Sequence, residues 1–298
     1  MGDRNRRLLL WLAYPGTVVM VFVVHALLLR VGMPIGASSY VAVVLGAGAV
    51  TLLERTIPYD RSWFPTSSDV GNDFVFMVTV QMVLPPMLSL FAGLTFIRTL
   101  ATLDGSTIRL WPHDLPLAVQ VTLMLLVAEL GRYWLHVAAH NTGLWRLHAV
   151  HHSVHKLYWL NVGRFHPLEK GIQFLFDALP FIVVGVGEEV LALYFIFYAV
   201  NGFFQHSNID ARYGLLNYII SSAELHRWHH SKLIEESNHN YGNNLIIWDL
   251  VFGTWYLPKE RRVGDLGLLN RDYPLSFIKQ LTSPLTAGLD KKGPSDPT

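Results

Sequence analysis

Five long apolar stretches constrain the fold of this chain more than any other feature. A helix that spans a lipid bilayer needs about 20 mostly apolar residues. Four of the stretches suit a single span each, and the last is too long for one span. They cover residues 8–29, 38–53, 74–97, 115–135 and 172–204. We therefore predict an all-α integral membrane bundle of four spanning helices plus a helical hairpin.

Prolines and glycines divide two of these stretches. Pro85 and Pro86 lie inside the third stretch, and proline removes a backbone hydrogen-bond donor, so we expect a kink there. The fifth stretch is interrupted by Gly185 and Gly187, followed by two glutamates. This break predicts two short helices that either cross the membrane or dip into it and return.

The overall composition excludes several classes of protein. The chain is 51% hydrophobic and 15% charged, whereas about a quarter of the residues of a soluble domain are charged. The formal net charge is +1 and there is no basic stripe with interleaved aromatic residues, so we expect no nucleic-acid partner. The absence of cysteine excludes disulfides, iron–sulfur clusters and thiolate-bound metals.

Histidines are concentrated in the second half of the chain, where 12 of the 14 lie between His136 and His239. Nine of them form three clusters and one single position: His136 and His140; His148, His151 and His152; His206; and His226, His229 and His230. Residues spaced i, i+3 and i+4 share one face of a helix, so each cluster can direct its rings at one point. Imidazole binds iron, zinc, copper and nickel. Nine such rings exceed what one ion uses, and we predict a histidine-ligated dimetal site.

The basic residues predict which side of the membrane carries these clusters. Arg4, Arg6 and Arg7 precede the first apolar stretch, and the positive-inside rule then places the N-terminus in the cytoplasm. Four spans and a hairpin return every cluster to the cytoplasmic side, where residues 137–170 and 207–275 would form a helical cap. Five further basic residues agree with a cytoplasmic C-terminus: Lys259, Arg261, Arg262, Lys291 and Lys292.

Acidic residues are scarce near the histidine clusters. Glu169, Glu224 and Asp249 are candidates to accept a hydrogen bond from the free ring N–H of a ligating histidine, an arrangement that orients the ring and tunes the metal. The alternative for each is an ordinary surface or capping acid. His25 and His113 lie outside the clusters, and we expect them to have almost no effect on activity.

A motif in several parts runs through the second half of the chain. Its segments are residues 129–153, 164–169, 206–208, 226–231 and 240–254. Together they resemble the fatty acid hydroxylase/sterol desaturase superfamily over roughly residues 115–256. The resemblance implies a membrane-bound, non-haem di-iron enzyme that uses O2 and two electrons to hydroxylate or desaturate a C–H bond of a lipid, with the nine histidines as iron ligands.

The apolar stretches, the resemblance and the composition of the C-terminal end together predict a division of the chain. Residues 1–114 would hold the N-terminal transmembrane helices, residues 115–275 a fatty acid hydroxylase-like catalytic domain, and residues 276–298 a disordered tail. Some members carry a His-x3-His motif near His206, but its first position here is Gly202. His239 is therefore a candidate tenth ligand. His155 and His166 are further candidates.

The resemblance implies partners that the sequence itself does not supply. The chain has no dinucleotide glycine fingerprint and no cysteine, so we expect a separate electron donor, a ferredoxin or a b-type cytochrome with its reductase. Sterol, fatty acyl, carotenoid-like and ether lipids are all possible substrates. The lack of a targeting extension suits a bacterial plasma membrane.

Two other functions are open at this stage. A zinc-dependent membrane hydrolase would use the same ring nitrogens, but catalytic zinc usually takes three protein ligands and one water. A metal transporter would place its ligands near mid-membrane on opposing helices, whereas these clusters lie mostly in polar segments. We therefore favour the lipid-oxidising enzyme.

Overall fold

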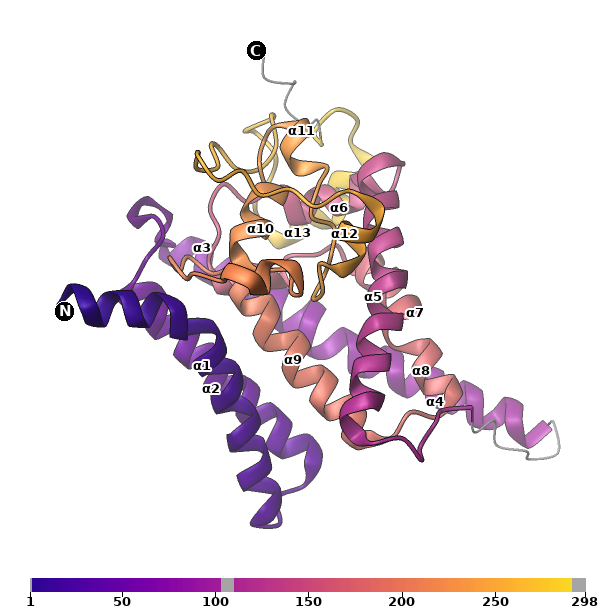
Figure 1. The fold of residues 1–298 in the computed structure, drawn as a ribbon. Helices are drawn as coiled ribbons and strands as arrows, with labels where there is room; N and C mark the ends of the chain where they lie inside the picture. The colour runs from indigo at the N-terminus through magenta and orange to yellow at the C-terminus, as the bar shows by residue number, and fades with distance from the viewer. Residues whose placement is uncertain (1, 103–109, 291–298) are drawn as a thin grey trace.

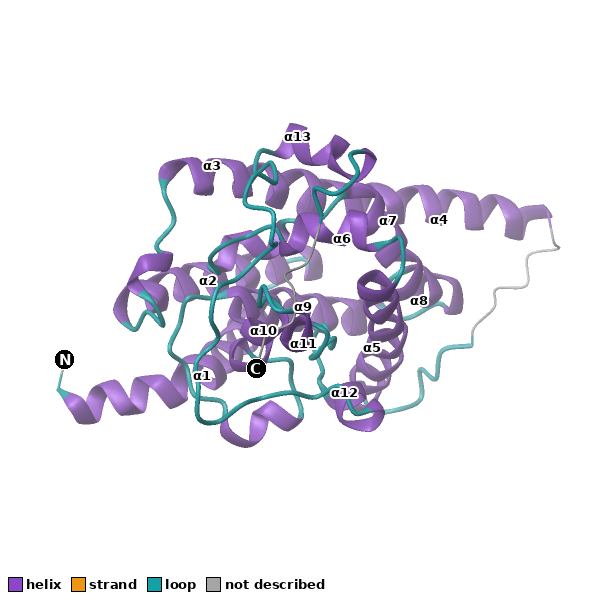
Figure 2. Ribbon diagram, turned by 90° about the horizontal axis from the view of Figure 1, so that it is seen from above, coloured by secondary structure: helices purple, strands orange, loops and turns teal. Residues whose placement is uncertain are grey.

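Long helices run through the lower part of the molecule, and short helices and loops cover their upper ends (Figure 1). The computed structural model describes residues 2–102 and 110–290, and within these ranges it contains helices but no β-strand (Figure 2). The long helices are α1 (Asp3–Arg30), α2 (Ile35–Thr56), α4 (Leu84–Thr102), α5 (Leu117–Asn141) and α9 (Glu188–His206). The third long segment begins with α3 (Ser67–Phe76) and the π-helix η2 (Met77–Val83), which lead directly into α4.

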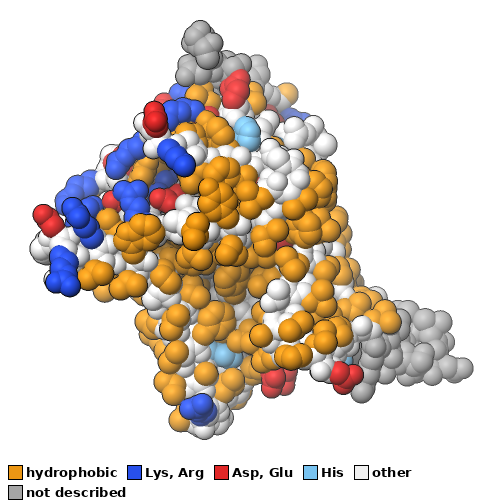
Figure 3. Space-filling view, viewed as in Figure 1, with side chains coloured by type: hydrophobic (Ala, Val, Ile, Leu, Met, Phe, Trp, Pro, Cys, Tyr) orange, Lys and Arg blue, Asp and Glu red, His pale blue; other side chains and the backbone are white. Residues whose placement is uncertain are grey.

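Among the described residues, four helical segments are long and apolar enough to cross a membrane, as the sequence predicted. They are α1, α2, the continuous segment 67–95 and α5. Apolar side chains cover the lower part of the surface in Figure 3, and Lys and Arg side chains gather above it. Large apolar residues of these helices, such as Leu12 and Phe91, are exposed, and an extended exposed apolar surface of this kind is typical of contact with lipid. The chain is therefore an all-α membrane protein.

The prolines of the third segment follow a change in helix type. Leu84 N–H donates to Thr79 O, five residues earlier, which is the pattern of a π-helix rather than an α-helix. Pro85 and Pro86 come next, and neither has an N–H to donate. We expected a kink at the prolines. The structure has a π-helical segment, which departs from α-helical geometry, just before them.

The fifth apolar stretch is divided into three helices rather than two. The descending arm consists of α7 (Pro167–Asp177) and α8 (Leu179–Val184), and α9 forms the returning arm (Figure 1). Gly185 ends α8 in the left-handed conformation with φ 76°, so the break lies where the glycines predicted it. The additional break falls at Ala178, whose φ of −129° and ψ of −50° depart from helical geometry.

Three helices meet closely on the left of the bundle in Figure 1. A Cβ atom on Gly46 of α2 would lie 3.0 Å from Val200 of α9 and 3.2 Å from Val21 of α1. The absence of a side chain at Gly46 therefore leaves room for valine side chains of the two neighbouring helices. Tyr14 Oη donates to Asn201 Oδ1 at 2.9 Å and adds a buried polar contact between α1 and α9.

The cap consists of short helices joined by loops. They are α6 (Trp145–His152), η3 (Trp159–Gly163), η4 (Gly214–Tyr218), α10 (Ala223–His229), α11 (Ile234–Ser237), α12 (Ile247–Phe252), α13 (Phe277–Thr282) and η5 (Ser283–Leu285), with η1 (Arg61–Trp63) between α2 and α3. The prediction of a disordered tail from residue 276 was wrong for the described part, since α13 and η5 lie there. Gln280 is buried and donates to Ser153 Oγ at 2.9 Å, so tertiary contacts order this segment. Residues 291–298, which include Lys291 and Lys292, lie outside the described residues.

Candidate metal centre

The nine clustered histidines come together from the C-terminal ends of α5 and α9 and from the short helices α6 and α10. Helix α5 carries the first cluster near its last turn, α6 carries the second, α9 ends at His206, and the end of α10 carries the last. The rings form two groups, in each of which the candidate ligand nitrogens lie within 4.8 Å of one another. The five-histidine group contains His136, His140, His148, His152 and His229, and the four-histidine group contains His151, His206, His226 and His230.

Two of the sequence clusters contribute histidines to both groups. His151 and His152 are adjacent on α6, yet they belong to different groups, and so do His229 and His230. Neighbouring residues on a helix project about 100° apart, so one helix end can serve two sites side by side. Which rings lie in the same group therefore depends on the tertiary structure, and not on which sequence cluster they belong to.

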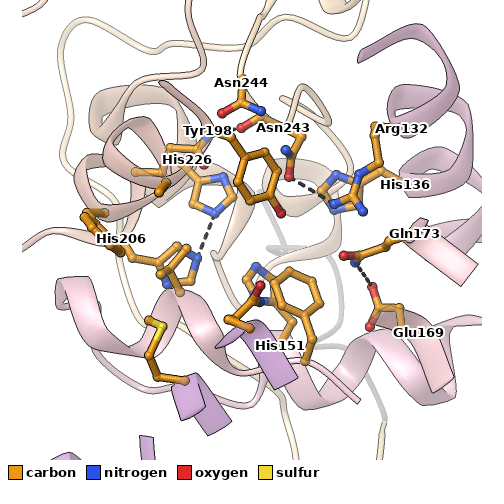
Figure 4. A pocket seen from close by; sticks show the side chains of 18 of the residues that line it. Arg132, His136, His151, Glu169, Gln173, Tyr198, His206, His226, Asn243 and Asn244 are labelled. Carbon is orange, nitrogen blue, oxygen red and sulfur yellow. Dashed lines mark hydrogen bonds between the residues drawn. The ribbon is translucent and has the colours of Figure 1, made fainter. Parts of the chain in front are cut away.

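The Nε2 atoms of these rings point at one another. In the five-histidine group, His136 Nε2 lies 3.0 Å from His148 Nε2, and His140 Nε2 lies 3.1 Å from His152 Nε2. In the four-histidine group, His226 Nε2 lies 3.1 Å from the Nε2 atom of the single histidine that ends α9 (Figure 4). Ring nitrogens from four separate segments thus converge on two small volumes.

The contacts of the Nδ1 atoms show which nitrogen carries the proton in three of the rings. The Nδ1 atoms of His136, His151 and His229 contact backbone carbonyl oxygens at 2.7, 3.1 and 2.8 Å. A carbonyl oxygen only accepts, so Nδ1 carries the proton and Nε2 presents a lone pair. His148, which faces His136, also has its Nδ1 on an acceptor, Glu169 Oε1, so two Nε2 lone pairs lie 3.0 Å apart and repel one another unless a cation lies between them. The donor set therefore fits two metal ions.

Burial keeps the rings neutral. The pKa values of His151, His152, His226 and His230 lie well below the ordinary value, first because burial disfavours the charged form and then because neighbouring imidazoles would repel it. A metal ligand has to be deprotonated, so this environment prepares the rings to bind an ion at neutral pH.

Side chains outside the two groups hold three further rings. His148 Nδ1 lies 2.7 Å from Glu169 Oε1, as expected for a carboxylate that orients a ligating histidine. His206 Nδ1 lies 2.8 Å from Asn161 Oδ1, and His140 Nδ1 lies 3.1 Å from Asn238 Oδ1. No local pattern indicates the two asparagines, since they lie 45 and 98 residues from their partners.

The other two acidic candidates do not contact a ligand ring. Asp249 accepts from Tyr241 N and Gly242 N, both at 2.7 Å, and so fixes the turn whose Tyr241 carbonyl receives His136. Burial raises the pKa of Asp249 to about 6, although these hydrogen bonds oppose the shift. Glu224 accepts from Asn217 Nδ2 at 2.7 Å on the outer side of the cap. The prediction for Glu224 is thus replaced by the ordinary structural role of an acid.

The histidine spacing does not point to one further buried acid near the site. Glu129 is fully buried on α5, and its carboxylate accepts from Asn244 N and Asn244 Nδ2, each at 2.7 Å. It also accepts from Leu245 N at 3.2 Å, so it holds the loop that closes the site from above. Glu129 is the only acid in the apolar stretch 115–135, and an acid in such a stretch usually has a function.

The three additional histidine candidates lie outside both groups. His239 contributes its backbone carbonyl, which receives His229 Nδ1, and its ring stacks on Tyr256. His166 is the N-cap residue of α7, and its Nδ1 accepts from Leu168 N at 3.2 Å. His155 lies beside a surface cleft near residues 262–271. The structure brings no tenth histidine to either group among the described residues.

A cavity of about 230 Å³ opens beneath the two groups. Five ligand candidates line its upper end: His136, His148, His151, His206 and His226. Its lining away from the histidines is mainly apolar and includes Val44 of α2, Met82 of η2 and Phe195 of α9, with Gln81 beside Met82. Val44 and Met82 are 66% and 51% exposed, so this part of the cavity meets the outer surface of the helices. Phe195 lies 11 residues before the end of α9, which corresponds to about 16 Å along the helix.

The fold and the site together define a helical membrane protein whose two histidine groups close a lipid-facing apolar cavity. The sequence profile of the fatty acid hydroxylase family matches residues 121–254. The chain is 34% identical to the ornithine lipid hydroxylase OlsE of Rhizobium tropici over 242 residues, which cover 80% of this chain and 72% of that protein. The chain belongs to the fatty acid hydroxylase family, within the superfamily that its motifs indicated.

More distant relatives match a smaller part of their own length. An alkylglycerol monooxygenase of Xenopus tropicalis is 29% identical, with 47% of this chain and 31% of that protein covered. A Delta(7)-sterol 5(6)-desaturase of Aspergillus fumigatus is 27% identical, with 49% of this chain and 42% of that protein covered. No solved structure matches the chain significantly. The named relatives are enzymes of lipids, which supports an enzyme that acts on a lipid.

Proposed function

We propose that the protein is a di-iron oxygenase that hydroxylates a C–H bond of a membrane lipid. One oxygen atom of O2 would enter the lipid as a hydroxyl group. The other would leave as water, with two protons and two electrons supplied from outside the chain. The observation that carries the proposal is the convergence of nine imidazoles at the closed end of an apolar cavity whose other end meets the lipid-facing surface.

The size of the histidine groups favours iron over zinc. Five and four nitrogen donors exceed the three protein ligands that catalytic zinc usually takes, and zinc does not change its oxidation state. Bound iron would supply the activation of O2 and the oxidation of the C–H bond. The chain itself holds the rings in place through Glu169, Asn161 and backbone carbonyls, and its apolar cavity excludes water from the substrate.

The names of the relatives limit the choice of reaction and of substrate. The relative that matches over most of this chain is named as a hydroxylase of ornithine lipid, and others are named for alkylglycerol and sterol. We therefore propose hydroxylation rather than desaturation. The proposed substrate is a lipid with a polar head and long apolar chains, not a water-soluble metabolite.

We further propose that the histidine end faces the cytoplasm of a bacterium and receives electrons there. The N-terminus, which carries Arg4, Arg6 and Arg7, lies at the level of the cap in Figure 1. A ferredoxin or a b-type cytochrome with its reductase could dock on Lys259 and Arg262, which are exposed. Arg261 is less available, because it is paired with Glu236. Unchanged turnover with the native donor after neutralisation of Lys259 and Arg262 would remove this docking site.

Lipid analysis of cells with and without the protein tests the proposal. Under 18O2 we expect one lipid species to gain a single labelled oxygen atom, and we expect purified protein to contain iron. A product that lacks two hydrogens would replace hydroxylation by desaturation. Anaerobic, zinc-dependent cleavage of a lipid, or metal flux through proteoliposomes, would instead support a hydrolase or a transporter.

A further inference from the structure

One wall of the cavity carries polar side chains that metal binding does not fully use. Glu169 and Gln173 lie one turn apart on α7, and Arg132 of α5 lies on the same side (Figure 4). Glu169 is 7% exposed and Gln173 is 2% exposed. The opposite end of the cavity is lined by apolar residues such as Val44 and Phe195. The cavity is therefore polar beside the histidines and apolar toward the lipid.

Two acceptor atoms of this polar wall have no hydrogen-bond partner in the described part of the chain. Glu169 Oε1 receives His148 Nδ1 at 2.7 Å and Gln173 Nε2 at 3.1 Å, but Glu169 Oε2 receives nothing. Gln173 Oε1 also lacks a partner, and Figure 4 shows its amide end directed toward the cavity. Buried acceptors without partners are rare, because each has lost its hydrogen bonds to water. A bound group with N–H or O–H donors would satisfy both atoms.

The cation on this wall, Arg132, already has partners for its guanidinium group. Arg132 Nη1 lies 3.4 Å from Asp177 Oδ2, and Arg132 Nη2 donates to Asn243 Oδ1 at 3.0 Å. A bare carboxylate would therefore find no unpaired cation here. It would also place its own acceptor oxygens against the acceptors of Glu169 and Gln173, which is unfavourable.

We propose that the cavity binds its lipid with a donor group innermost. A hydroxyl or N–H group of the lipid donates to Gln173 Oε1 and Glu169 Oε2, and the apolar chain extends past Phe195 toward Val44 and Met82. This inference deepens the proposed function and rests on it for the identity of the occupant as a lipid. It has a consequence for the reaction: the carbon that is oxidised lies within a few bonds of the polar group, not near the methyl end of a chain.

Binding of simple lipid probes tests this orientation without turnover. The metal-loaded protein in detergent is titrated with hexadecanol and its methyl ether, and with palmitamide and N,N-dimethylpalmitamide. Each pair differs mainly in the donor. We expect the donor-bearing member of at least one pair to bind about tenfold more tightly, and the pair that discriminates identifies the group as a hydroxyl or an N–H.

Two glutamine variants separate recognition from general damage. Gln173→Met removes the acceptor while keeping a similar volume, so the discrimination within the pair should disappear while the metal content is retained. Gln280→Met is the matched control, because Gln280 is also buried and its Oε1 also lacks a partner in the described residues, but it does not line the cavity. The control should keep the discrimination.

The possible results distinguish the inference from the proposed function. Equal binding within both pairs by the unaltered protein, or discrimination that survives in Gln173→Met, overturns the inference. Oxidation of the native lipid near its methyl end also overturns it, while leaving the oxygenase function intact. Clear discrimination in a protein that never forms an O2-dependent product supports the inference and removes the oxygenase function.

Discussion

The two histidine groups differ in how firmly the protein holds their rings. In the five-histidine group, the Nδ1 atoms of four rings contact acceptors: Tyr241 O, Asn238 Oδ1, Glu169 Oε1 and His239 O. In the four-histidine group, only His151 and His206 have such contacts, and the Nδ1 atoms of His226 and His230 have no partner among the described residues. A partner at the outer nitrogen fixes the orientation of a ligating ring. We infer that the five-histidine group is the more rigid site and the four-histidine group the more adaptable one.

The largest effect is expected from two neighbouring substitutions, one in each group. His229→Ala and His230→Ala should each lower turnover at least about 100-fold, because the reaction needs both ions. They should differ in metal content. His230→Ala leaves three rings in its group and should lose about one iron per chain, whereas His229→Ala leaves four rings and should retain more.

Metal analysis of the purified variants, alongside His148→Ala, checks this prediction. The loss should be confined to metal and turnover, with membrane insertion unchanged. Full turnover in any of the three variants would show that the altered ring is not a ligand. Equal metal loss in the two neighbouring variants would contradict the difference between the groups.

The next effect concerns the carboxylate that holds a ring of the five-histidine group. Glu169→Ala removes the partner of His148 Nδ1 and should weaken metal binding about 10- to 100-fold. Glu169→Gln keeps an acceptor and should lose less. The rate of iron loss to a chelator measures the effect, and a rate like that of the unaltered protein would show that the contact does not support the metal.

A smaller effect is expected from the corresponding amide in the four-histidine group. Asn161→Ala removes the partner of His206 Nδ1 and should weaken metal binding about tenfold, because a hydrogen bond to a neutral amide is weaker than one to a carboxylate. The same chelator assay compares it with Glu169→Ala. A larger loss for Asn161→Ala would reverse the ranking of the two groups.

The lowered pKa values of the cap histidines predict an effect of acid on the metal-free protein. His151, His152, His226 and His230 resist protonation when folded, but in the unfolded chain they titrate near their ordinary value of 6.5. The free energy of unfolding should therefore be insensitive to these groups above pH 6.5 and fall as the pH drops below it, by about 1.4 kcal/mol per pH unit for each ring. Denaturant titrations in detergent at about pH 7.5 and pH 5.5 measure this, and equal stability at both would contradict the burial of neutral rings.

The smallest effect is expected at a histidine far from the site. His25 is buried between α1 and α2, where its Nδ1 lies 3.0 Å from Ser38 Oγ. His25→Ala should lower stability by about 1 kcal/mol through loss of this hydrogen bond and leave turnover within about twofold. Thermal unfolding and the product assay report the two quantities separately. A large loss of turnover without unfolding would show that the helical hairpin α1–α2 takes part in the reaction.

The sequence by itself determined the long helices of this protein and the chemistry of its candidate metal ligands. The apolar stretches were long enough to predict the four spanning helices, because the thickness of a bilayer sets a length that can be counted along the chain. The spacing of the histidines placed each cluster on one helix face, since helical periodicity is a local property. The combined motifs pointed to the correct superfamily.

Only the tertiary structure decided which rings share a site and what surrounds them. Adjacent residues such as His229 and His230 joined different groups, and the partners Asn161 and Glu129 act on segments 45 and about 115 residues away. The order of the segment around Gln280 likewise depends on its contact with Ser153. Contacts between distant segments depend on how helices pack, which local spacing does not specify. The polar wall of Glu169, Gln173 and Arg132 depends on such contacts between α5 and α7. We propose that this wall selects lipids that carry a hydrogen-bond donor.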